Sequence, residues 1–427
     1  MTAPYKFETQ CLHAGHTPDA ETRSRAVPVY RSTSYVFDSS DHAAELFALK
    51  QPGNIYSRMT NPTQDVLEKR MAALEGGGAA LALASGTAAI YYAVINICSA
   101  GEAIVAANNL YGGTMTMFHN ILPQFGFRVD FVDPHNPENF AEAVTEKTRA
   151  LFMETIGNPS LEVTDLSRVA AVGRRYNLPV IVDSTFTTPY LLRPLEFGAD
   201  IVVHSLTKWI GGHGTGIGGI VVDGGCFDWT DPKFSLYNTP DPSNFNLRFA
   251  RDLGEKNPLA FIERMRQVPL RNLGACISPD NAWLFLQGLE TLPLRMQRHC
   301  ENAMQAAEFL RSHPAVAWVR YPGLTDDPAH PTAESYLQNG YGAMVVFGIK
   351  GGREAGKRFI DRLKLFSHLA NVGDAKSLAL HPASTTHSQL SEEQQMAGGL
   401  SPDMIRLSIG IESIGDILAD LDQALGG

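Results

Sequence analysis

Residues 180–208 read VIVDSTFTTPYLLRPLEFGADIVVHSLTK, and this stretch decides the fold. It contains two short apolar runs, 180–183 and 200–204, separated by a segment with prolines and a glycine. Continuous apolar runs of this length are typical of strands buried on both faces of a parallel sheet. Each run leads to a side chain that can take part in a reaction: Asp183 ends the first run, and Lys208 follows the second.

The same pattern extends to both sides of this stretch. Further apolar runs predict strands at 80–84, 102–107, 128–133, 149–154 and 218–222. Periodic apolar residues predict helices at 64–74, 88–98 and 167–176, and another helix follows Gly112 and Gly113. Because strands that alternate with helices indicate βαβ units, the sequence predicts an α/β fold with a mainly parallel central sheet in a large domain.

A smaller C-terminal domain is predicted to follow. A helical stretch begins at Ser278 with proline next in the chain, and it extends to about Arg311 with a break at Pro293. Strands at 343–349 and 404–410 flank a helix at 352–363, which indicates an α+β domain. The predicted organisation is an irregular N-terminal arm, a large α/β domain and a C-terminal α+β domain, with the bounds 1–62, 63–265 and 266–427.

The composition is that of an ordinary globular protein. Of 427 residues, 44% are hydrophobic and 19% are charged, and the formal net charge is -10. This composition excludes collagen-like and intrinsically disordered chains. A net negative charge repels phosphate backbones and anionic lipid, which argues against nucleic acid or a membrane surface as a partner.

Cysteine use points to a reducing compartment. The chain has 5 cysteines that lie far apart and form no C-x-x-C pair, which fits neither a disulfide framework nor a zinc site. Residues 79–100 are uncharged and long enough to span a bilayer, but Ser85–Thr87 divide them into a strand and a helix. The first residues, MTAPYKFETQ, show no secretory signal pattern. We therefore expect a cytoplasmic protein.

Asp183 and Lys208 follow strands whose carboxyl ends are expected at one edge of the sheet, where open parallel sheets bind ligands. A free lysine amine has a pKa of about 10.4, so it is almost entirely protonated at neutral pH. It becomes a nucleophile or base when it is desolvated, placed near other cations or held as a Schiff base. Pyridoxal phosphate offers the last route, and an acid such as Asp183 would keep its ring nitrogen protonated. The alternatives are a turn-capping aspartate and a solvated surface lysine.

A phosphate group would find donors at the same edge. Gly86 and Thr87 open a helix after Ser85, and free N–H groups at a helix N-terminus bind anions. Because a helix terminus contributes at most about 2 kcal/mol, Ser205, Thr207 and a cationic side chain are expected to share the charge. The alternative for the Ser-Gly-Thr run is a simple helix cap.

Other strands of the set lead to further polar or aromatic side chains at this edge. Tyr111 follows the strand at 102–107, while Glu154 and Asn158 end and follow the strand at 149–154. Their convergence with Asp183 and Lys208 favours a site over isolated caps and surface charges.

Two other patterns are set aside. Residues 214–219 match G-x-G-x-x-G, but they precede a strand, whereas a dinucleotide site needs the glycines between a strand and a helix. We expect these glycines to let the backbone pass close to the Lys208 turn. The histidine pairs lack the i, i+4 spacing and third ligand of a metal site, so no metal centre is predicted; these pairs are His13 with His16 and His381 with His387.

Taken together, the motifs closely resemble the Cys/Met-metabolism family of pyridoxal-phosphate enzymes, nearly from end to end. The stretches that carry the resemblance are HAGHTPD, RAVPVYRSTSYVF, YSRMTNPT, ASGTAAI, LYGGT, ETIGNPSLEVTD, VIVDSTF, VVHSLTKWIGGHGTGIGG, VPLRNLGACISPDNAWLFLQGLETLPLRM, VGDAKSLALHPASTTHSQLS and IRLSIGIE. The lysine signature HS-x-TK followed by GGHG is far more specific than a lone glycine loop. The resemblance implies a fold-type I pyridoxal-phosphate-dependent transferase.

The resemblance also implies a role for each candidate residue. Lys208 would be the Schiff-base lysine and Asp183 the partner of the pyridinium nitrogen, while Tyr111 would stack on the ring and assist proton transfer. The remaining cofactor-binding residues would be Ser85, Gly86, Thr87, Asn158, Ser205 and Thr207, with Tyr56 and Arg58 supplied by the neighbouring subunit of a dimer, usually within a homotetramer. Substrate would be bound by Asn158, Ser377 and Arg406, the last through its bidentate fork.

The implied reaction is γ-replacement on O-acetyl-L-homoserine with sulfide or a small thiol such as methanethiol, giving L-homocysteine or L-methionine and acetate. Freed Lys208 would be the mobile base. The alternatives within the family are methionine γ-lyase and cystathionine γ-synthase or γ-lyase activity. Methionine γ-lyases carry Cys after the Tyr-Gly of the LYG motif, and Gly113 at this position argues against that activity.

Two stretches depart from the family pattern. Thr87 stands where relatives more often carry Gln or Met, but the backbone N–H is the expected phosphate donor there. Residues 244–256 differ from the usual sequence, which affects the expected pocket entrance and thiol preference. A non-catalytic pyridoxal-phosphate-binding protein is the alternative from another class, and it would be expected to lack Lys208, Asp183 or Arg406, all of which are present.

Overall fold

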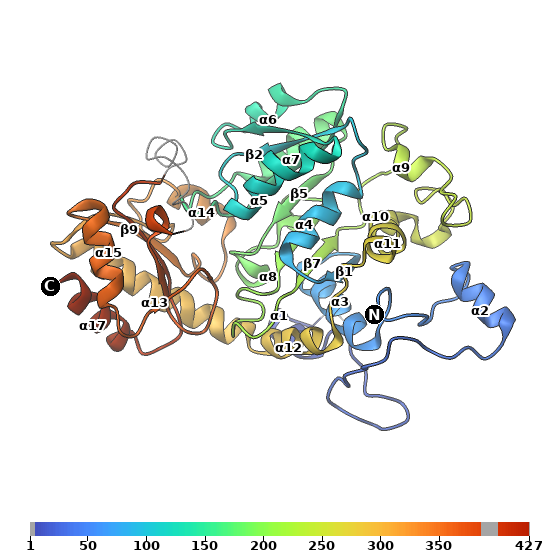
Figure 1. Ribbon diagram of the computed structural model, residues 1–427, viewed down its shortest axis with the longest axis horizontal. Helices are drawn as coiled ribbons and strands as arrows, with labels where there is room; N and C mark the ends of the chain where they lie inside the picture. Colours follow the sequence, from blue (N-terminus) through green and yellow to red (C-terminus); the bar gives the residue numbers. More distant parts are fainter. Residues whose placement is uncertain (1–4, 386–399, 427) are drawn as a thin grey trace.

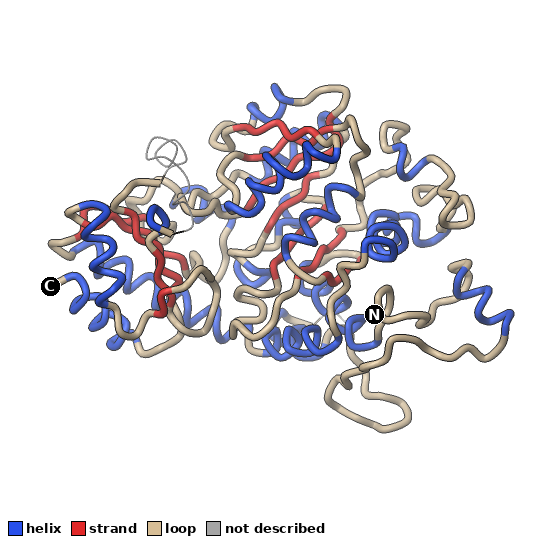
Figure 2. The backbone as a smooth tube through the Cα atoms, in the orientation of Figure 1, coloured by secondary structure: helices blue, strands red, loops and turns tan. Residues whose placement is uncertain are grey.

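The computed structural model describes residues 5–385 and 400–426, and its strands form a seven-stranded and a five-stranded sheet. Figure 1 shows the larger sheet with its helices at the centre and the smaller sheet at the C-terminal end of the molecule. Figure 2 shows the same two groups of strands, each flanked by helices. The two sheets are in contact through their connecting segments: residues that follow strands of the larger sheet contact residues of the smaller sheet at the site described below.

The larger sheet is mainly parallel, as the sequence predicts. Its order is β1-β7-β6-β5-β4-β2-β3, and β7 is antiparallel to both of its neighbours. Each strand lies within one residue of its predicted bounds; the strands are β1 (Ala79–Leu83), β2 (Ala103–Ala107), β3 (Arg128–Val132), β4 (Thr148–Glu154), β5 (Val180–Asp183), β6 (Ile201–Ser205) and β7 (Gly219–Asp223).

Both faces of this sheet are covered, which explains why its strands read as continuous apolar runs. Along β1, Leu81 and Leu83 belong to one buried cluster, whereas Ala80 and Ala82 belong to another. Side chains alternate between the faces of a strand, so a strand that is covered on both faces is apolar along its length. The edge strand β3 differs: its residues are exposed or half-buried, and they include Arg128 and Asp130. The helices around this sheet are α3 (Pro62–Glu75), α4 (Gly86–Ile95), α5 (Gly112–Thr116), α6 (Glu138–Ala143), α7 (Leu166–Tyr176), α8 (Thr188–Leu191), α9 (Ser235–Asn238), α10 (Ala260–Met265), α11 (Arg271–Leu273) and α12 (Pro279–Glu290).

The uncharged segment 79–100 forms strand β1 and helix α4, as the break at Ser85 predicts. The Ser85 hydroxyl accepts the Ala88 N–H at 3.0 Å and caps α4. Among the helices of the described ranges, none has both the length and the apolar character that a membrane crossing requires.

The smaller sheet is mixed and has the order β10-β11-β12-β9-β8. Its strands are β8 (Val316–Arg320), β9 (Met344–Ile349), β10 (Ser367–His368), β11 (Leu378–Leu380) and β12 (Met404–Ser408). Helices α13 (Leu292–Ser312), α14 (His330–Tyr336), α15 (Gly352–Arg362) and α17 (Ile414–Leu425) accompany it. Strands β9 and β12 and helix α15 match the prediction, and the predicted helical break separates α12 from α13 at Thr291. The predicted domain bounds stay a prediction; α12 packs on α3 beside the larger sheet.

The N-terminal arm is less irregular than the sequence suggests. It contains α1 (Phe7–His13) and α2 (Ser40–Phe47), and α1 packs on α3 and α12. Between these helices the chain leaves the body of the molecule, as the blue trace in Figure 1 shows. Short helical turns complete the fold at Met117–Ile121, Leu122–Phe125, Pro194–Phe197, Gly254–Leu259, Arg266–Leu270 and Pro382–Ser384.

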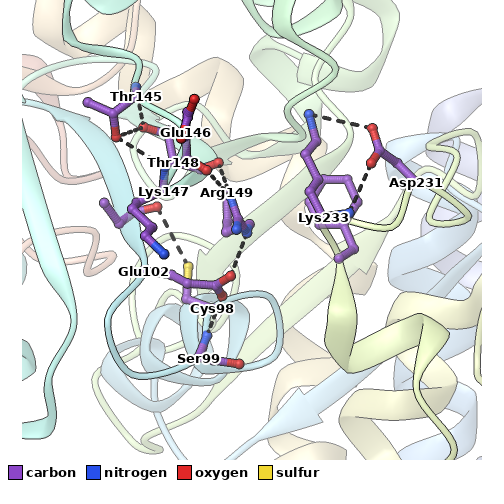
Figure 3. Close-up of polar contacts among 12 residues, drawn as sticks. Cys98, Ser99, Glu102, Thr145, Glu146, Lys147, Thr148, Arg149, Asp231 and Lys233 are labelled. Atoms are coloured by element: carbon purple, nitrogen blue, oxygen red, sulfur yellow. Dashed lines mark hydrogen bonds and ion pairs between the residues drawn. The ribbon is translucent and has the colours of Figure 1, made fainter.

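A nearly buried ion pair joins two strands at the edge where the parallel strands begin. Arg149 Nε donates to Glu102 Oε1 at 2.7 Å, and the Arg149 guanidinium also donates to the Glu146 and Thr148 carbonyls (Figure 3). Glu102 Oε2 accepts the Ser99 N–H at 2.7 Å. A buried pair that is satisfied in this way fixes the amino ends of β2 and β4, opposite the edge that carries the candidate site.

Asp223 lies at the same edge as this ion pair, because β7 is antiparallel, and it makes stability depend on pH. Burial, with a smaller contribution from Asp200, raises its pKa from 3.8 to about 7. A folded pKa above the unfolded value means that ionisation opposes folding, so stability falls as the pH rises through this window. Asp223→Asn removes this ionisation. Its advantage over the native chain in free energy of unfolding is therefore expected to grow by about 2 to 3 kcal/mol from pH 5 to pH 8.

Chemical unfolding at the two pH values measures this difference. The exposed Asp228→Asn variant is the matched control, since hydrogen bonds from Thr230 lower the pKa of Asp228 where burial raises that of Asp223. An equal gain for Asp223→Asn at pH 5 and pH 8 would contradict the prediction.

Candidate active site

The carboxyl ends of five strands of the larger sheet, β1, β2, β4, β5 and β6, meet at one edge, as predicted. The register pairs Glu154 with Asp183 across β4 and β5. It pairs Ser205 with Gly219, which in turn pairs with Leu83 just before the start of α4. The tertiary structure therefore brings together side chains that the sequence separates by more than 100 positions.

Lys208 lies in the turn after β6, and its side chain is only partly exposed. Burial, with a smaller contribution from the Arg406 charge, lowers its pKa from 10.5 to about 8. Its Nζ donates to Asn371 Oδ1 at 2.5 Å. An amide oxygen holds the amine without supplying a negative charge that would raise the pKa again. The structure thus places a lysine with an appreciable neutral fraction at the sheet edge.

Asn371 is a contact that the sequence analysis missed. It lies between β10 and β11 of the smaller sheet, in a segment that reaches across to the Lys208 turn. Gly373 in this segment has φ +78°, and a Cβ there would lie 2.6 Å from the Trp209 nitrogen. The Ala375 N–H also donates to the Gly212 carbonyl at 2.8 Å. The sequence feature that could have pointed to Asn371 is its place immediately before the VGDAKSL run of the family pattern.

Asp183 and Glu154 form a pair of neighbouring carboxyl groups. Asp183 Oδ1 accepts the Thr185 N–H at 2.9 Å, and burial is the main cause that raises the Asp183 pKa. Glu154 is 6% exposed, and burial followed by the Asp183 charge raises its pKa well above the usual value. A carboxyl group that is costly to ionise here gains a partner when a cationic ring nitrogen lies against it.

The start of α4 lies against the end of β6. A Cβ at Gly86 would lie 2.6 Å from the Ser205 Cβ, so glycine is required for this close approach. The Ser85 hydroxyl caps the helix, which leaves the backbone N–H groups of Gly86 and exposed Thr87 as anion donors. The Thr207 hydroxyl is hydrogen-bonded to the Gly218 backbone at 3.1 and 3.3 Å. These groups form a cradle that fits a phosphate.

Tyr111, Asn158 and Arg406 complete the group from three different elements. Tyr111 is the N-cap residue of α5 and is 50% exposed. The absence of a side chain at Gly113 makes room for its ring, since a Cβ there would lie 2.5 Å from the ring. Arg406, on β12, donates to Asn158 Oδ1 at 3.1 Å. Burial lowers the Arg406 pKa to about 10, which leaves the guanidinium charged at neutral pH.

Three predicted residues are not part of this group in the described chain. Ser377 is fully buried, and its hydroxyl donates to Glu412 Oε2 at 2.9 Å and accepts the Gly410 N–H. Tyr56 and Arg58 lie on the arm, where the Arg58 guanidinium is 5.2 Å from the Tyr56 ring centroid and donates to the Arg271 carbonyl. Their predicted roles stay predictions.

The glycine-rich run and the histidines have other contacts. The Gly218 N–H donates to the Thr207 hydroxyl next to the Lys208 turn. Gly219 packs on Ser85, where a Cβ would lie 2.1 Å from the Ser85 carbonyl oxygen. His381 contacts Ser384 and the Pro402 carbonyl, and His387 lies outside the described residues. Within the two described ranges, no three His, Cys, Asp or Glu side chains are grouped as metal ligands.

A family model described as "Cys/Met metabolism PLP-dependent enzyme" matches residues 8–426. The chain belongs to this family. It is 54% identical to O-acetyl-L-homoserine sulfhydrylase of Leptospira meyeri, with 100% of this chain and 98% of the relative covered. It is 53% identical to O-acetyl-L-homoserine sulfhydrylase 1 of Thermus thermophilus, covering 98% and 100%, and 50% identical to homocysteine synthase of Schizosaccharomyces pombe, covering 98% of each.

A solved structure shares the fold. The crystal structure of a protein described as an O-acetylhomoserine (thiol)-lyase from Campylobacter jejuni superimposes with a TM-score of 0.95 at 39% identity, covering 99% of this chain and 100% of that one. It contains a pyridoxyl-lysine phosphate group. Membership of the family makes pyridoxal phosphate the cofactor of this chain. The glycine-lined cradle, the half-buried Asp183 carboxyl and the Lys208 amine fit its phosphate, ring nitrogen and aldehyde.

Proposed function

We propose that this chain transfers the four-carbon amino-acid group of O-acetyl-L-homoserine to sulfide, or to a small thiol such as methanethiol, and releases acetate. The observation that carries the proposal is that the Lys208 amine and the Asp183 carboxyl lie on neighbouring strand ends of the larger sheet, with the Arg406 guanidinium of β12 close enough to lower the Lys208 pKa. The names of relatives at 50 to 54% identity, covered over almost their whole length, supply the substrate class.

Each proposed role follows from the chemistry of the side chain. When bound, pyridoxal phosphate supplies an aldehyde for an amine to attack and a ring that withdraws electrons from the bonds of that amine's carbon. Asp183 holds the ring nitrogen, and the α4 N-terminus with Ser205 and Thr207 holds the phosphate. Arg406 binds the substrate carboxylate, with Asn158 orienting the guanidinium. The Lys208 amine takes the proton from the substrate Cα, and Tyr111 covers the ring and assists proton transfer.

The test uses the purified enzyme with O-acetyl-L-homoserine. Acetate release that requires sulfide and yields homocysteine is the expected result. Failure to form homocysteine would overturn the proposed reaction but not the cofactor. Steady formation of 2-oxobutanoate from methionine would instead establish methionine γ-lyase activity, and a comparison of sulfide, methanethiol and cysteine as acceptors would identify the preferred thiol.

We also propose that two copies of the chain share each site, within a homotetramer. The arm exposes large apolar side chains, among them Val36 at 96%, Phe37 at 38% and Phe47 at 42%. Contiguous apolar surface of this kind is typical of an interface. On this proposal, Tyr56 and Arg58 reach the phosphate of a neighbouring subunit, and Arg58 adds a cation to the phosphate-binding groups of that subunit.

Mixed subunits give a specific prediction. Arg58→Ala and Lys208→Ala are each expected to be nearly inactive alone. When they are co-expressed, half of the dimers are mixed, and one site of each mixed dimer carries neither change, so activity returns to about a quarter of the native value. Activity no higher than the mean of the two single variants would contradict a shared site.

We propose a cytoplasmic location for the enzyme. The five cysteines are free in the described structure, and Cys11, Cys98 and Cys300 are buried as thiols. Free thiols are typical of a reducing compartment. Fractionation of cells that express the native chain tests this location.

A further inference from the structure

Glu154 is a buried carboxyl group to which the roles above assign nothing. It ends β4 and pairs directly with Asp183 across β4 and β5. Directly paired residues of neighbouring strands direct their side chains to the same face of the sheet, so the two carboxyl groups lie on one side. Two neighbouring carboxylates that are withdrawn from water repel each other strongly, and one of them binds a proton more readily.

Tyr111 depends on Glu154 for its place. Glu154 Oε1 accepts the Tyr111 N–H at 2.7 Å, at the point where α5 begins without a side-chain cap of its own. Glu154 lies on a strand and not in the helix, but it accepts the N–H of the N-cap residue as the acidic residue of a capping box does. The Tyr111 ring packs on Gly113, where a Cβ would lie 2.5 Å from it, so the backbone that this bond holds also sets where the ring lies.

The loops around Glu154 link Tyr111 to the substrate side of the site. The Asn158 N–H donates to the Asn109 carbonyl at 3.3 Å, and Asn109 Nδ2 donates to Glu162 Oε2 at 3.2 Å. Gly157 packs on Asn109, where a Cβ would lie 2.7 Å from the amide nitrogen. Asn158 in turn accepts a hydrogen bond from Arg406. Glu154 therefore contacts the loop that carries Tyr111 and begins the loop that carries Asn158, the hydrogen-bond partner of Arg406.

We propose that Glu154 is a positioning residue that acts in its neutral, protonated form: it fixes Tyr111 through the backbone N–H and leaves Asp183 to supply the negative charge for the ring nitrogen. The raised pKa of Glu154, caused by burial and by the Asp183 charge, agrees with this assignment. The kinetic part of the proposal rests on the proposed function, whereas the spectroscopic part needs only the bound cofactor.

The test compares two substitutions of nearly equal length. Glu154→Gln keeps an acceptor for the Tyr111 N–H and carries no charge, so kcat is expected within about threefold of the native value. Glu154→Met removes the acceptor, and kcat is expected to fall about ten- to a hundredfold with a smaller change in KM. The visible circular dichroism of the bound cofactor is expected to be native in the Gln variant and altered in the Met variant, because the Tyr111 ring moves.

A matched control separates charge from positioning. Asp183→Asn makes the same carboxyl-to-amide change on the neighbouring strand, where the charge itself is needed, and a large loss of kcat is expected. If Glu154→Gln is as inactive as Asp183→Asn, Glu154 acts as an anion and the proposal is overturned. A native cofactor spectrum and native kcat in Glu154→Met would overturn it as well. If the Met variant does not fold, the cofactor spectrum and kcat of Glu154→Gln, compared with those of Asp183→Asn, decide the question. If the enzyme does not use sulfide, the comparison of cofactor spectra still tests the positioning role.

Discussion

Replacement of Lys208 by alanine is expected to abolish covalent attachment of the cofactor and to lower kcat by at least about a thousandfold. The side chain is proposed to act twice, as the amine that binds the cofactor and as the base at the substrate Cα. Its environment prepares it for both tasks, since burial and Arg406 lower its pKa to about 8. At pH 8 about half of such an amine is neutral, compared with less than about one part in a hundred for an ordinary lysine.

Borohydride reduction followed by peptide mapping measures the attachment. The native enzyme is expected to be labelled at Lys208, and the alanine variant to bind the cofactor reversibly and stay unlabelled. Lys208→Arg is the control that keeps the positive charge without a nucleophilic amine, and it should be as inactive as the alanine variant. Because the alanine leaves space, small primary amines in the buffer should restore part of the activity in Lys208→Ala and not in Lys208→Arg. Labelling of another side chain would remove Lys208 from this role.

Asp183→Asn is expected to lower kcat by about a hundred- to a thousandfold while it raises the thermal stability of the cofactor-free chain. Burial raises the pKa of Asp183, so its ionised form costs folding free energy that an isosteric amide does not. The cationic ring nitrogen of the bound cofactor offsets this cost and needs the charge in return, since its ability to withdraw electrons depends on remaining protonated. Function and stability therefore change in opposite directions at this residue.

Thermal unfolding with and without the cofactor, together with kcat, checks this prediction. Asp183→Glu keeps the charge but lengthens the side chain, and it is expected to retain more activity than Asp183→Asn. Lower stability of the Asp183→Asn chain without cofactor would show that the native carboxylate already has a strong partner in the protein. A kcat within tenfold of the native value would show that the ring nitrogen does not depend on this charge.

Most of the larger sheet could be predicted because the pattern that identifies a buried strand lies within the strand itself. Its inner strands are buried on both faces, so a continuous apolar run of the right length identifies each of them without knowledge of its neighbours. The strand ends then identify Asp183 and Lys208, since parallel strands place their carboxyl ends at one edge. In contrast, β10 and β11 are too short to give a pattern, and they are strands only because β10 pairs with β11 and β11 pairs with β12.

Part of the candidate site was beyond prediction for the same reason. Ser377 stands in a conspicuous motif but is buried against Glu412, whereas Asn371, just before that motif, contacts Lys208. Nothing in the local sequence distinguishes these two positions, because the difference is set by how the segment between β10 and β11 lies on the Lys208 turn.

The sequence by itself determined the α/β class, the order of the strands along the chain, the family and the cofactor, since apolar runs and the lysine signature are properties of neighbouring residues. The tertiary structure decided which side chains meet. The pairing of Glu154 with Asp183, the contact of Lys208 with Asn371 and the pKa of about 8 at Lys208 all depend on burial and on groups far away in the chain. Electrostatic energies depend on distance and on the exclusion of water, and neither is fixed until the sheets have packed together.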